Sequence, residues 1–153
     1  MKKIILILVI IFTIIIFICF FYRSSGIMIC TYRNNADIYS IDTLYKVSYN
    51  NKIVDKVYTK EEIISSDEDL LKEYKFTLDS IYSKYRNFDN YSNKVILEKN
   101  KIISITNINY QKLDVDEFIR IDKNNKNLFD NKKIKINNLK KLYKANGAKC
   151  IYK

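Results

Sequence analysis

Three acidic residues that lie close together in the sequence could bind a metal ion. Asp114, Asp116 and Glu117 place carboxylates within four residues of one another. Residues 122–127, DKNNKN, also begin like a calcium-binding loop, but they lack its glycine and terminal glutamate, and Lys126 occupies a ligand position. Asp114 and Glu117 have the spacing of a helix cap, which explains them more simply. We therefore predict no metal site and no cofactor.

The chain contains no histidine, which excludes several common kinds of active site. Histidine is the usual general base, the commonest zinc ligand and the partner that activates serine or cysteine nucleophiles. The two glycines, Gly26 and Gly147, cannot form a glycine-rich phosphate loop. We therefore predict that the protein is not an enzyme and assign no catalytic residue. An envelope enzyme using carboxylate or tyrosine chemistry is the alternative, and a deep polar cleft gathering two or more acidic side chains would favour it.

Two of the three cysteines lie in the part of the chain that we expect to fold, Cys30 near its start and Cys150 near its end. Disulfides form outside the cytoplasm, so these two are natural partners if the domain is exported. A bridge would close a loop of more than a hundred residues and contribute about 4 to 5 kcal/mol in the chain-entropy model. Two buried, unpaired thiols are the alternative. We predict the disulfide Cys30–Cys150.

The first part of the chain differs sharply from the rest. Residues 4–21 are eighteen consecutive uncharged and almost wholly apolar residues, enough for roughly 27 Å of helix, which matches the hydrocarbon layer of a bilayer. Lys2 and Lys3 precede this run, which favours a cytoplasmic N-terminus and transfer of the remainder. We therefore predict a single N-terminal transmembrane or signal helix within residues 1–26, followed by an extracytoplasmic domain over residues 27–153.

A cleaved signal peptide is the main alternative to a retained anchor. Ser24 and Gly26 are small residues at the spacing that signal peptidase requires. Cys19 does not fit a lipoprotein signal, because the bulky Ile18 precedes it. Arg23 follows the apolar run and weakens the charge asymmetry. A domain that stays in the cytoplasm is therefore a further alternative.

Positive charge is concentrated in the last quarter of the chain. The net charge is +10, and residues 120–153 hold 11 basic but only 2 acidic residues, whereas residues 27–119 hold 13 basic and 15 acidic residues. Such a region would attract anionic lipid headgroups or acidic envelope polymers within a Debye length of about 8 Å. A solvated lysine-rich surface without a partner is the alternative. The predicted basic contact surface consists of Lys132, Lys133, Lys135, Lys140, Lys141 and Lys144.

The hydrophobic pattern after the apolar run predicts one α+β domain. Alternation of apolar and polar residues indicates strands, whereas Leu71, Leu78 and Tyr85 recur at helical spacing. We expect an antiparallel sheet built from hairpins, with one long amphipathic helix packed on it. The predicted strands are residues 27–33, 38–49, 52–63, 93–99 and 102–110 and a last strand around Cys150; the long helix spans residues 66–87, and shorter helices follow Asp114 and Asn137.

Local signals add detail to this prediction. Ser65 and Glu68 have the spacing of a capping box at the start of the long helix. Asn137 is a good N-cap for the last helix. The apolar phase shifts within the predicted strand 102–110, which indicates a β-bulge near residues 106–107.

With its elements in this order, the chain resembles the YehR-like family of small bacterial lipoproteins, particularly its low-GC Gram-positive members. The resemblance covers most of residues 27–153 and depends on the segments MICTY, SSDEDLLKEYKFTLDSIYSKY, ISITNINYQKLDVDEF and LKKLYKANGAKC. It implies an exported, membrane-attached α+β domain with no established activity, so no functional residue is carried over. The chain departs from the family at the lipidation motif, where Ile18 precedes Cys19.

These observations lead to one functional hypothesis. We expect a single-pass protein of the cell membrane whose extracytoplasmic domain is a non-catalytic binding or scaffold module of the cell envelope. Its expected partners are membrane lipid, contacted by the N-terminal helix, and an anionic envelope polymer or another protein, contacted by the basic region. Export makes nucleic acid an unexpected partner, although lysines interleaved with Tyr143 would suit one.

Overall fold

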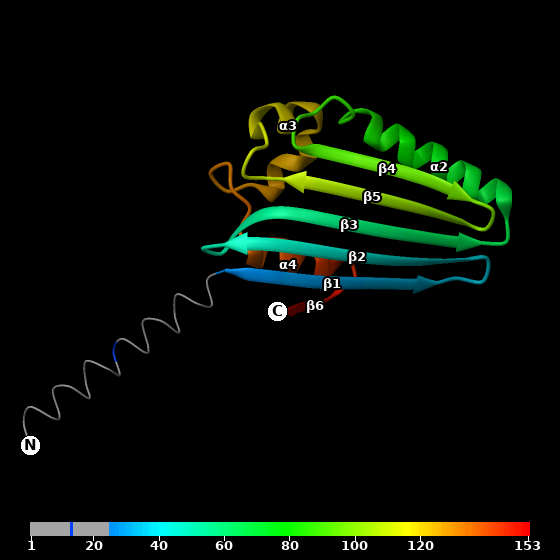
Figure 1. Ribbon diagram of the computed structural model, residues 1–153, viewed down its shortest axis with the longest axis horizontal. Helices are drawn as coiled ribbons and strands as arrows, with labels where there is room; N and C mark the ends of the chain where they lie inside the picture. Colours follow the sequence, from blue (N-terminus) through cyan, green and yellow to red (C-terminus); the bar gives the residue numbers. More distant parts are fainter. Residues whose placement is uncertain (1–12, 14–24) are drawn as a thin grey trace, which may run out of the picture.

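The computed structural model describes Thr13 and residues 25–153. Six antiparallel strands form one sheet in the order β4-β5-β3-β2-β1-β6 (Figure 1). This confirms the predicted α+β fold with a sheet built from hairpins, and it places the last strand beside the first. The strands are β1 (Gly26–Asn35), β2 (Tyr39–Asn50), β3 (Ile53–Ser65), β4 (Tyr91–Glu98), β5 (Lys101–Asn109) and β6 (Lys149–Tyr152).

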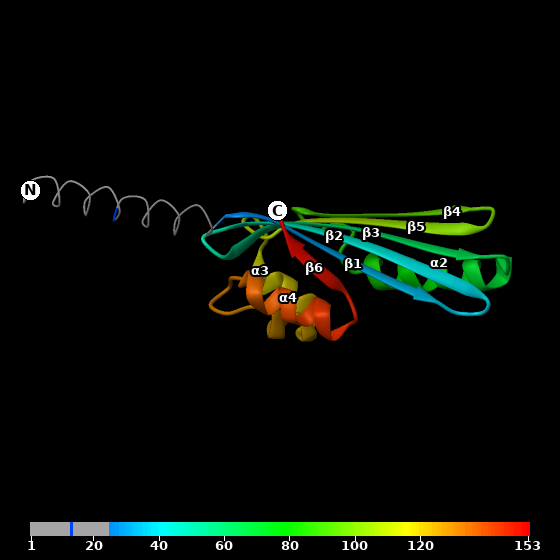
Figure 2. The same ribbon diagram turned by 90° about the horizontal axis from the view of Figure 1, so that it is seen from below.

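The helices all lie on one side of this sheet, as the edge-on view shows (Figure 2). They are α2 (Glu68–Ser83), α3 (Val115–Ile121) and α4 (Ile136–Ala145), with the short 3-10 helix η1 (Lys123–Leu128) between the last two. Helix α2 is the predicted long amphipathic helix, although it ends at Ser83. The described residues leave the other side of the sheet uncovered, and we call that side the open face.

The predicted N-terminal helix lies almost wholly outside the described residues. Of residues 1–26, only Thr13, Ser25 and Gly26 belong to the described part, and Gly26 already begins β1. Within the described part of the chain, no helix is long and apolar enough to cross a bilayer. The transmembrane or signal helix therefore stays a prediction.

The hydrophobic core lies between the sheet and its helices. Under α4, Met28 and Val47 from the sheet pack with Leu139. Under α2, Leu71 packs with Ile63 and Ile102, which β3 and β5 contribute. A third cluster surrounds Phe118 of α3, whose ring contacts those of Tyr85, Phe88, Tyr110 and Phe129. Burial of these side chains holds each helix against its own part of the sheet.

The predicted disulfide is confirmed. Cys30 of β1 and Cys150 of β6 are directly opposite each other in the antiparallel register, and their sulfurs are bonded. Their Cα atoms are 4.0 Å apart, and the two residues are separated by 120 positions in the sequence. Cys30 is fully buried on the helix side. The bond therefore joins the first strand of the domain to the last.

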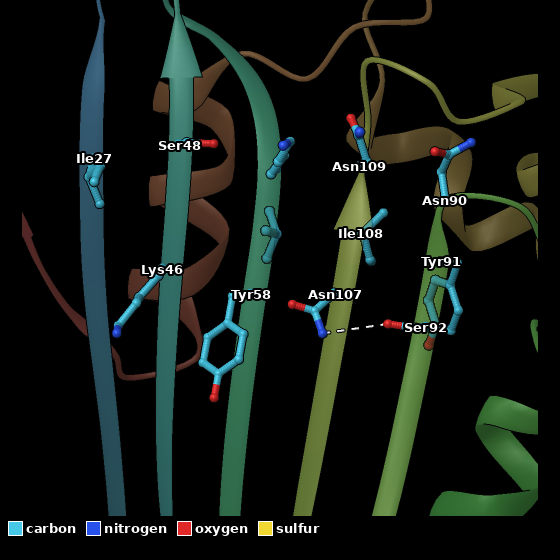
Figure 3. A pocket seen from close by; sticks show the side chains of 12 residues that line it. Ile27, Lys46, Ser48, Tyr58, Asn90, Tyr91, Ser92, Asn107, Ile108 and Asn109 are labelled. Atoms are coloured by element: carbon cyan, nitrogen blue, oxygen red, sulfur yellow. Dashed lines mark hydrogen bonds between the residues drawn. The ribbon is translucent and has the colours of Figure 1, made fainter.

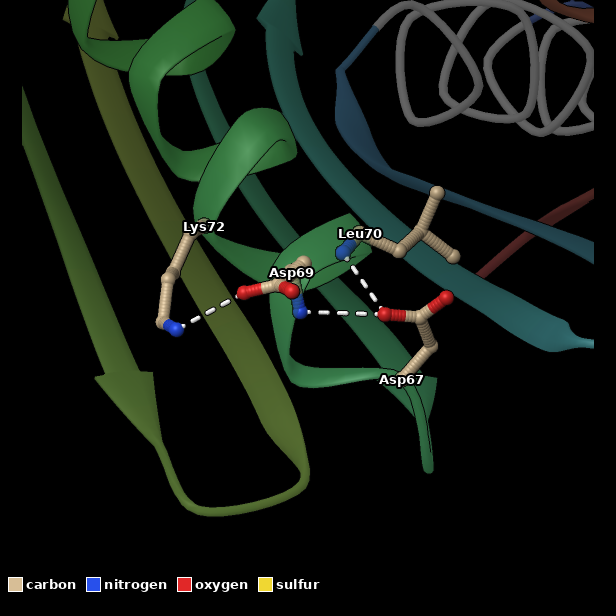
Figure 4. Close-up of polar contacts among 4 residues, drawn as sticks. All are labelled: Asp67, Asp69, Leu70 and Lys72. Atoms are coloured by element: carbon tan, nitrogen blue, oxygen red, sulfur yellow. Dashed lines mark hydrogen bonds and ion pairs between the residues drawn. The ribbon is translucent and has the colours of Figure 1, made fainter.

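The cap of α2 differs from the predicted capping box. The N-cap is Asp67, whose carboxylate accepts from the backbone N–H groups of Asp69 and Leu70, both at 3.0 Å (Figure 4). Ser65 instead donates its hydroxyl to the carbonyl of Ile38 at 2.7 Å. Asp67 directly precedes Glu68, the first residue of the helix, whereas Ser65 lies two residues earlier, so Asp67 occupies the N-cap position that the capping box assigned to Ser65.

Helix α4 also starts differently from the prediction. It begins at Ile136, its N-cap is Lys135, and no side chain caps it, so the prediction of Asn137 is wrong. The Ile136 N–H donates to the carbonyl of Lys52 at 2.9 Å. Lys52 lies in the tight β2–β3 turn, where it and Asn51 have φ values of 63° and 48°. The turn of the sheet therefore satisfies a helix donor that would otherwise need a cap.

The predicted bulge in β5 is wrong, because its pairing with β3 and β4 is continuous. The change of apolar phase arises because Ile103 and Ile105 point to the open face, whereas Ile102 and Ile108 point to the helix side. The irregularity of the sheet lies instead in β3, where the register with β2 shifts and Asp55 is the additional residue.

Candidate binding surface on the open sheet face

The open face is a mixed surface of basic, amide, hydroxyl and aliphatic side chains. Alternation along the strands and the strand register assign each side chain to one side of the sheet. Seven basic residues occupy the open face, namely Arg33, Lys46, Lys56, Lys60, Lys94, Lys101 and Lys149. Three acidic residues share it, namely Asp42, Glu62 and Glu98.

Each of the three carboxylates on the open face has a cationic partner. Arg33 contacts Asp42 through two guanidinium nitrogens, and its Nη2 lies 3.2 Å from Oδ2. Lys60 pairs with Glu62 at 2.7 Å, and Lys101 pairs with Glu98 at 3.3 Å. The hydrogen bond with Asp42 raises the pKa of Arg33, and that with Glu62 raises the pKa of Lys60.

The four other lysines of the face, Lys46, Lys56, Lys94 and Lys149, form no ion pair with any described carboxylate. All four are exposed. After the three ion pairs are set aside, these lysines leave the face with an excess of four positive charges. The open face therefore carries an uncompensated charge that an anionic partner would neutralise.

A shallow hollow of about 510 Å³ lies on this face, at the end of the sheet where β1 begins (Figure 3). One row across four strands lines it: Lys46, Tyr58, Asn107 and Ser92 are successive neighbours in the register. The ammonium of Lys46 lies 5.8 Å from the centre of the Tyr58 ring. Asn107 Nδ2 donates to the Ser92 hydroxyl at 3.5 Å. Lysine charge, aromatic surface and amide groups therefore meet in one place.

Asn109 adds an unsatisfied acceptor to the same hollow. It lies beside Lys56 in the register, and both residues line the hollow. Its Oδ1 atom is buried and has no hydrogen-bond partner among the described residues. Buried polar atoms nearly always have a partner, and a rotation of the amide that turned this oxygen into the hollow would let it accept from an outside donor.

The predicted basic contact surface is partly neutralised. Lys132 pairs with Asp116 and Lys135 with Asp130, each at 2.5 Å. Both lysines belong to the segment that leads into α4. The two cations are therefore less available to a partner than the sequence suggests.

The remaining members of that set lie before and along α4, on the helix side of the molecule. The Lys140 ammonium lies 4.1 Å from the centre of the Tyr152 ring. Lys133, Lys141 and Lys144 are exposed and form no ion pair with a described residue. A contact between these lysines and a partner stays a prediction. The sequence patterns do not indicate the open face as a site.

The acidic residues considered as metal ligands have structural contacts. Asp114 caps α3 by accepting from the Glu117 N–H at 3.1 Å, as predicted. Asp122 accepts from the Asn124 N–H at 3.0 Å at the start of η1. In the described part of the chain, no group of three or more histidine, cysteine or acidic side chains could hold a metal ion.

One surface hollow of about 610 Å³ gathers three carboxylates, those of Asp55, Asp114 and Asp116, and is also lined by Lys132 and Lys133. Asp55 accepts from Gln111 Nε2 at 2.5 Å, Asp114 caps a helix, and Asp116 pairs with Lys132. Each carboxylate therefore already has a partner. The hollow is the described site that comes nearest to the acidic cleft expected of an enzyme.

Three largely buried tyrosines favour their neutral form. Burial raises the pKa of Tyr91, Tyr110 and Tyr143 well above the ordinary value. A phenolate nucleophile requires a lowered pKa, so these rings are suited to packing. On the helix side, burial also raises the pKa of Glu61, which lies opposite Thr43 in the register.

Comparison with known proteins shows the fold. No protein-family model and no curated protein matches the sequence. The structure is similar to the NMR structure of YehR from E. coli, with a TM-score of 0.53 and 18% identity over 80% of this chain and 89% of that chain. It is also similar to the NMR structure of a protein from Streptococcus pneumoniae TIGR4, with a TM-score of 0.52 and 16% identity over 82% of this chain and 85% of that chain.

Proposed function

From the YehR-like fold and the charge on its open face, we propose that this chain is a non-catalytic binding domain tethered to the outer side of the cell membrane. The open face of the sheet is its contact surface. The observation that carries the proposal is the excess of four lysines on a face whose carboxylates are all ion-paired. A side of a sheet that is uncovered and charged in this way is suited to recognition rather than to folding.

The sequence before β1 supports the tether. The apolar run ends at Phe21, and four residues separate it from Gly26. Four residues span at most about 14 Å, so an inserted run would keep the start of β1 close to the membrane surface. The disulfide Cys30–Cys150 supports an extracytoplasmic location, because such bonds persist in oxidising compartments.

Binding is favoured over catalysis because the carboxylates of the open face are ion-paired. Acid–base catalysis needs a carboxyl group free to exchange a proton with its substrate. On the open face, Asp42, Glu62 and Glu98 are instead held by Arg33, Lys60 and Lys101. The cations that remain can attract a ligand but offer no base.

An envelope enzyme is the second candidate, and the hollow formed by Asp55, Asp114 and Asp116 is the observation that favours it. The substitution Asp55→Asn would test it directly, because Asp55 caps no helix and its contact with Gln111 is exposed. Loss of a hydrolytic activity in the Asn variant, with an unchanged unfolding curve, would favour the enzyme over the binding domain.

Site-specific photocrosslinking in native membranes tests the proposed surface. A photoreactive amino acid at position 58 lies on the open face, and the same amino acid at position 141 on α4 provides the matched control. We expect crosslinks to an envelope component from position 58 and few from position 141. Crosslinks from position 141 alone would move the contact surface to the predicted basic region.

A further inference from the structure

We propose that the hollow around Tyr58 binds an anionic polyol or sugar chain whose units are joined by phosphodiesters. The inference rests on the proposed function, because it assigns a ligand class to the same open face. It depends on three properties of that face: the spacing of the lysines, the neutral groups beside them and the twist of the sheet.

The lysine spacing is suited to a ligand with repeating charge. Lys46 of β2 lies opposite Tyr58 of β3, and Lys56 lies two residues before Tyr58 on the same strand. Diagonal neighbours of this kind have Cα atoms about 7 to 8 Å apart. Both lysines line the hollow and neither has an anionic partner among the described residues. Two neighbouring phosphates of a short-repeat polymer could therefore be neutralised at once.

The groups beside these lysines are suited to hydroxyl-bearing carbon chains. The Tyr58 ring offers an aromatic surface, and Asn107 and Ser92 offer amide and hydroxyl groups beside it (Figure 3). Asn109 provides an acceptor, Oδ1, that has no donor within the described structure. A ligand hydroxyl would supply that donor after a rotation of the amide, which removes the penalty of a buried unsatisfied oxygen.

The cations left on this face are compatible with phosphodiester groups. Arginine binds carboxylates and phosphates alike through a planar pair of hydrogen bonds, whereas lysine binds either anion as a point charge. The arginine of this face, Arg33, already forms such a contact with Asp42. The cations that remain are lysines, which suit a singly charged phosphodiester in many orientations.

The shape of the face favours a flexible chain over a flat bilayer. Lys94 and Lys149 lie on β4 and β6, the two edge strands, which are separated by five steps across the sheet. Five steps correspond to about 24 Å and to a twist of roughly 100°. A planar headgroup layer could not contact both edges together, whereas an extended polymer could follow the twist.

Binding of a synthetic glycerol-phosphate oligomer to the full chain in phosphatidylcholine nanodiscs tests this inference. We expect Lys46→Gln/Lys56→Gln to weaken binding about tenfold, in a salt-dependent manner. The control Lys141→Gln/Lys144→Gln removes the same charge from α4 and should change binding less than about twofold. Tyr58→Thr should weaken binding several-fold even at high salt, because the contact between the tyrosine ring and the oligomer is not ionic.

Four outcomes would overturn the inference. Equal losses of affinity in the two double variants would show that binding depends only on the total charge of the protein. Equally tight binding of polyglutamate would indicate an acidic polypeptide, and competition by phosphatidylglycerol nanodiscs would indicate lipid. Absence of oligomer binding, with crosslinks from position 58 retained in native membranes, would reject the ligand class but leave the proposed contact surface in place.

Discussion

Cys30 and Cys150 are joined directly across the first and last strands of the domain, although 120 positions separate them in the sequence. The bond holds the four-residue strand β6 against β1 at the edge of the sheet. We predict that the variant Cys30→Ser/Cys150→Ser loses about 2 to 5 kcal/mol in its free energy of unfolding, because the unfolded chain gains entropy. Urea denaturation with and without reductant measures this.

Reduced wild-type protein is the comparison for that variant, since it lacks the bond but keeps both side chains. The reductant should lower the stability of the wild type and leave that of the double variant unchanged. A wild-type curve that does not respond to reductant would mean that the two thiols are not bonded.

Helix α2 offers a matched pair of substitutions that tests its packing. Leu71 is 1% exposed against Ile63 and Ile102, whereas Phe76 is 77% exposed on the same helix. We predict that Leu71→Ala costs about 2 to 5 kcal/mol, because it leaves a cavity, and that Phe76→Ala changes stability by less than about 0.5 kcal/mol. Denaturation curves of similar midpoint for the two variants would contradict the described face of α2.

The start of α2 distinguishes the observed cap from a capping box. We predict that Asp67→Ala costs about 1 kcal/mol, because two backbone donors lose their acceptor. Asp67→Asn should keep most of that stability. Glu68→Ala should have little effect, whereas a capping box formed with Ser65 would make Glu68 as important as Asp67. Thermal denaturation followed by circular dichroism measures all three.

Glu61 gives the stability a specific dependence on pH. Burial raises its pKa above the ordinary value of 4.5, so above that pH the folded state binds more protons than the unfolded state. Its contribution to stability is therefore complete at low pH and is lost as the pH rises through the folded-state pKa. We predict that Glu61→Gln gains stability over the wild type between about pH 4 and about pH 7.

Gln can still accept the weak hydrogen bond from the Thr43 hydroxyl at 3.4 Å, so the variant isolates the charge. Glu62→Gln on the open face of the same strand is the control, and it should show no such gain. A constant difference between Glu61→Gln and wild type across this pH range would contradict the burial of the Glu61 carboxyl.

The sequence was sufficient to predict the elements and much of their packing. Alternation placed the long hairpin and the second hairpin, and helical spacing placed the stripe that includes Leu71 and Leu78, because these patterns depend on local geometry. The start of α4 could not be predicted, since its first donor is satisfied by Lys52, far away in the sequence. Ile103 and Ile105 are apolar residues on the open face, and they shift the phase of the hydrophobic pattern as a β-bulge would.

The candidate site could not be found from the sequence, because it depends on the strand order. Lys46, Lys56, Lys94 and Lys149 are scattered over about a hundred positions and share one face only in the order β4-β5-β3-β2-β1-β6. The count of charges pointed instead to the C-terminal region, where Lys132 and Lys135 prove to be ion-paired. The distribution of lysines along a sequence does not show which of them are neutralised.

Amine-reactive footprinting in native membranes, compared with the purified full chain in detergent, tests the open face most directly. We expect the native partner to protect Lys46, Lys56, Lys94 and Lys149, while Lys141 and Lys144 react equally in both states. Protection of the two α4 lysines with unchanged labelling of the open face would contradict this expectation.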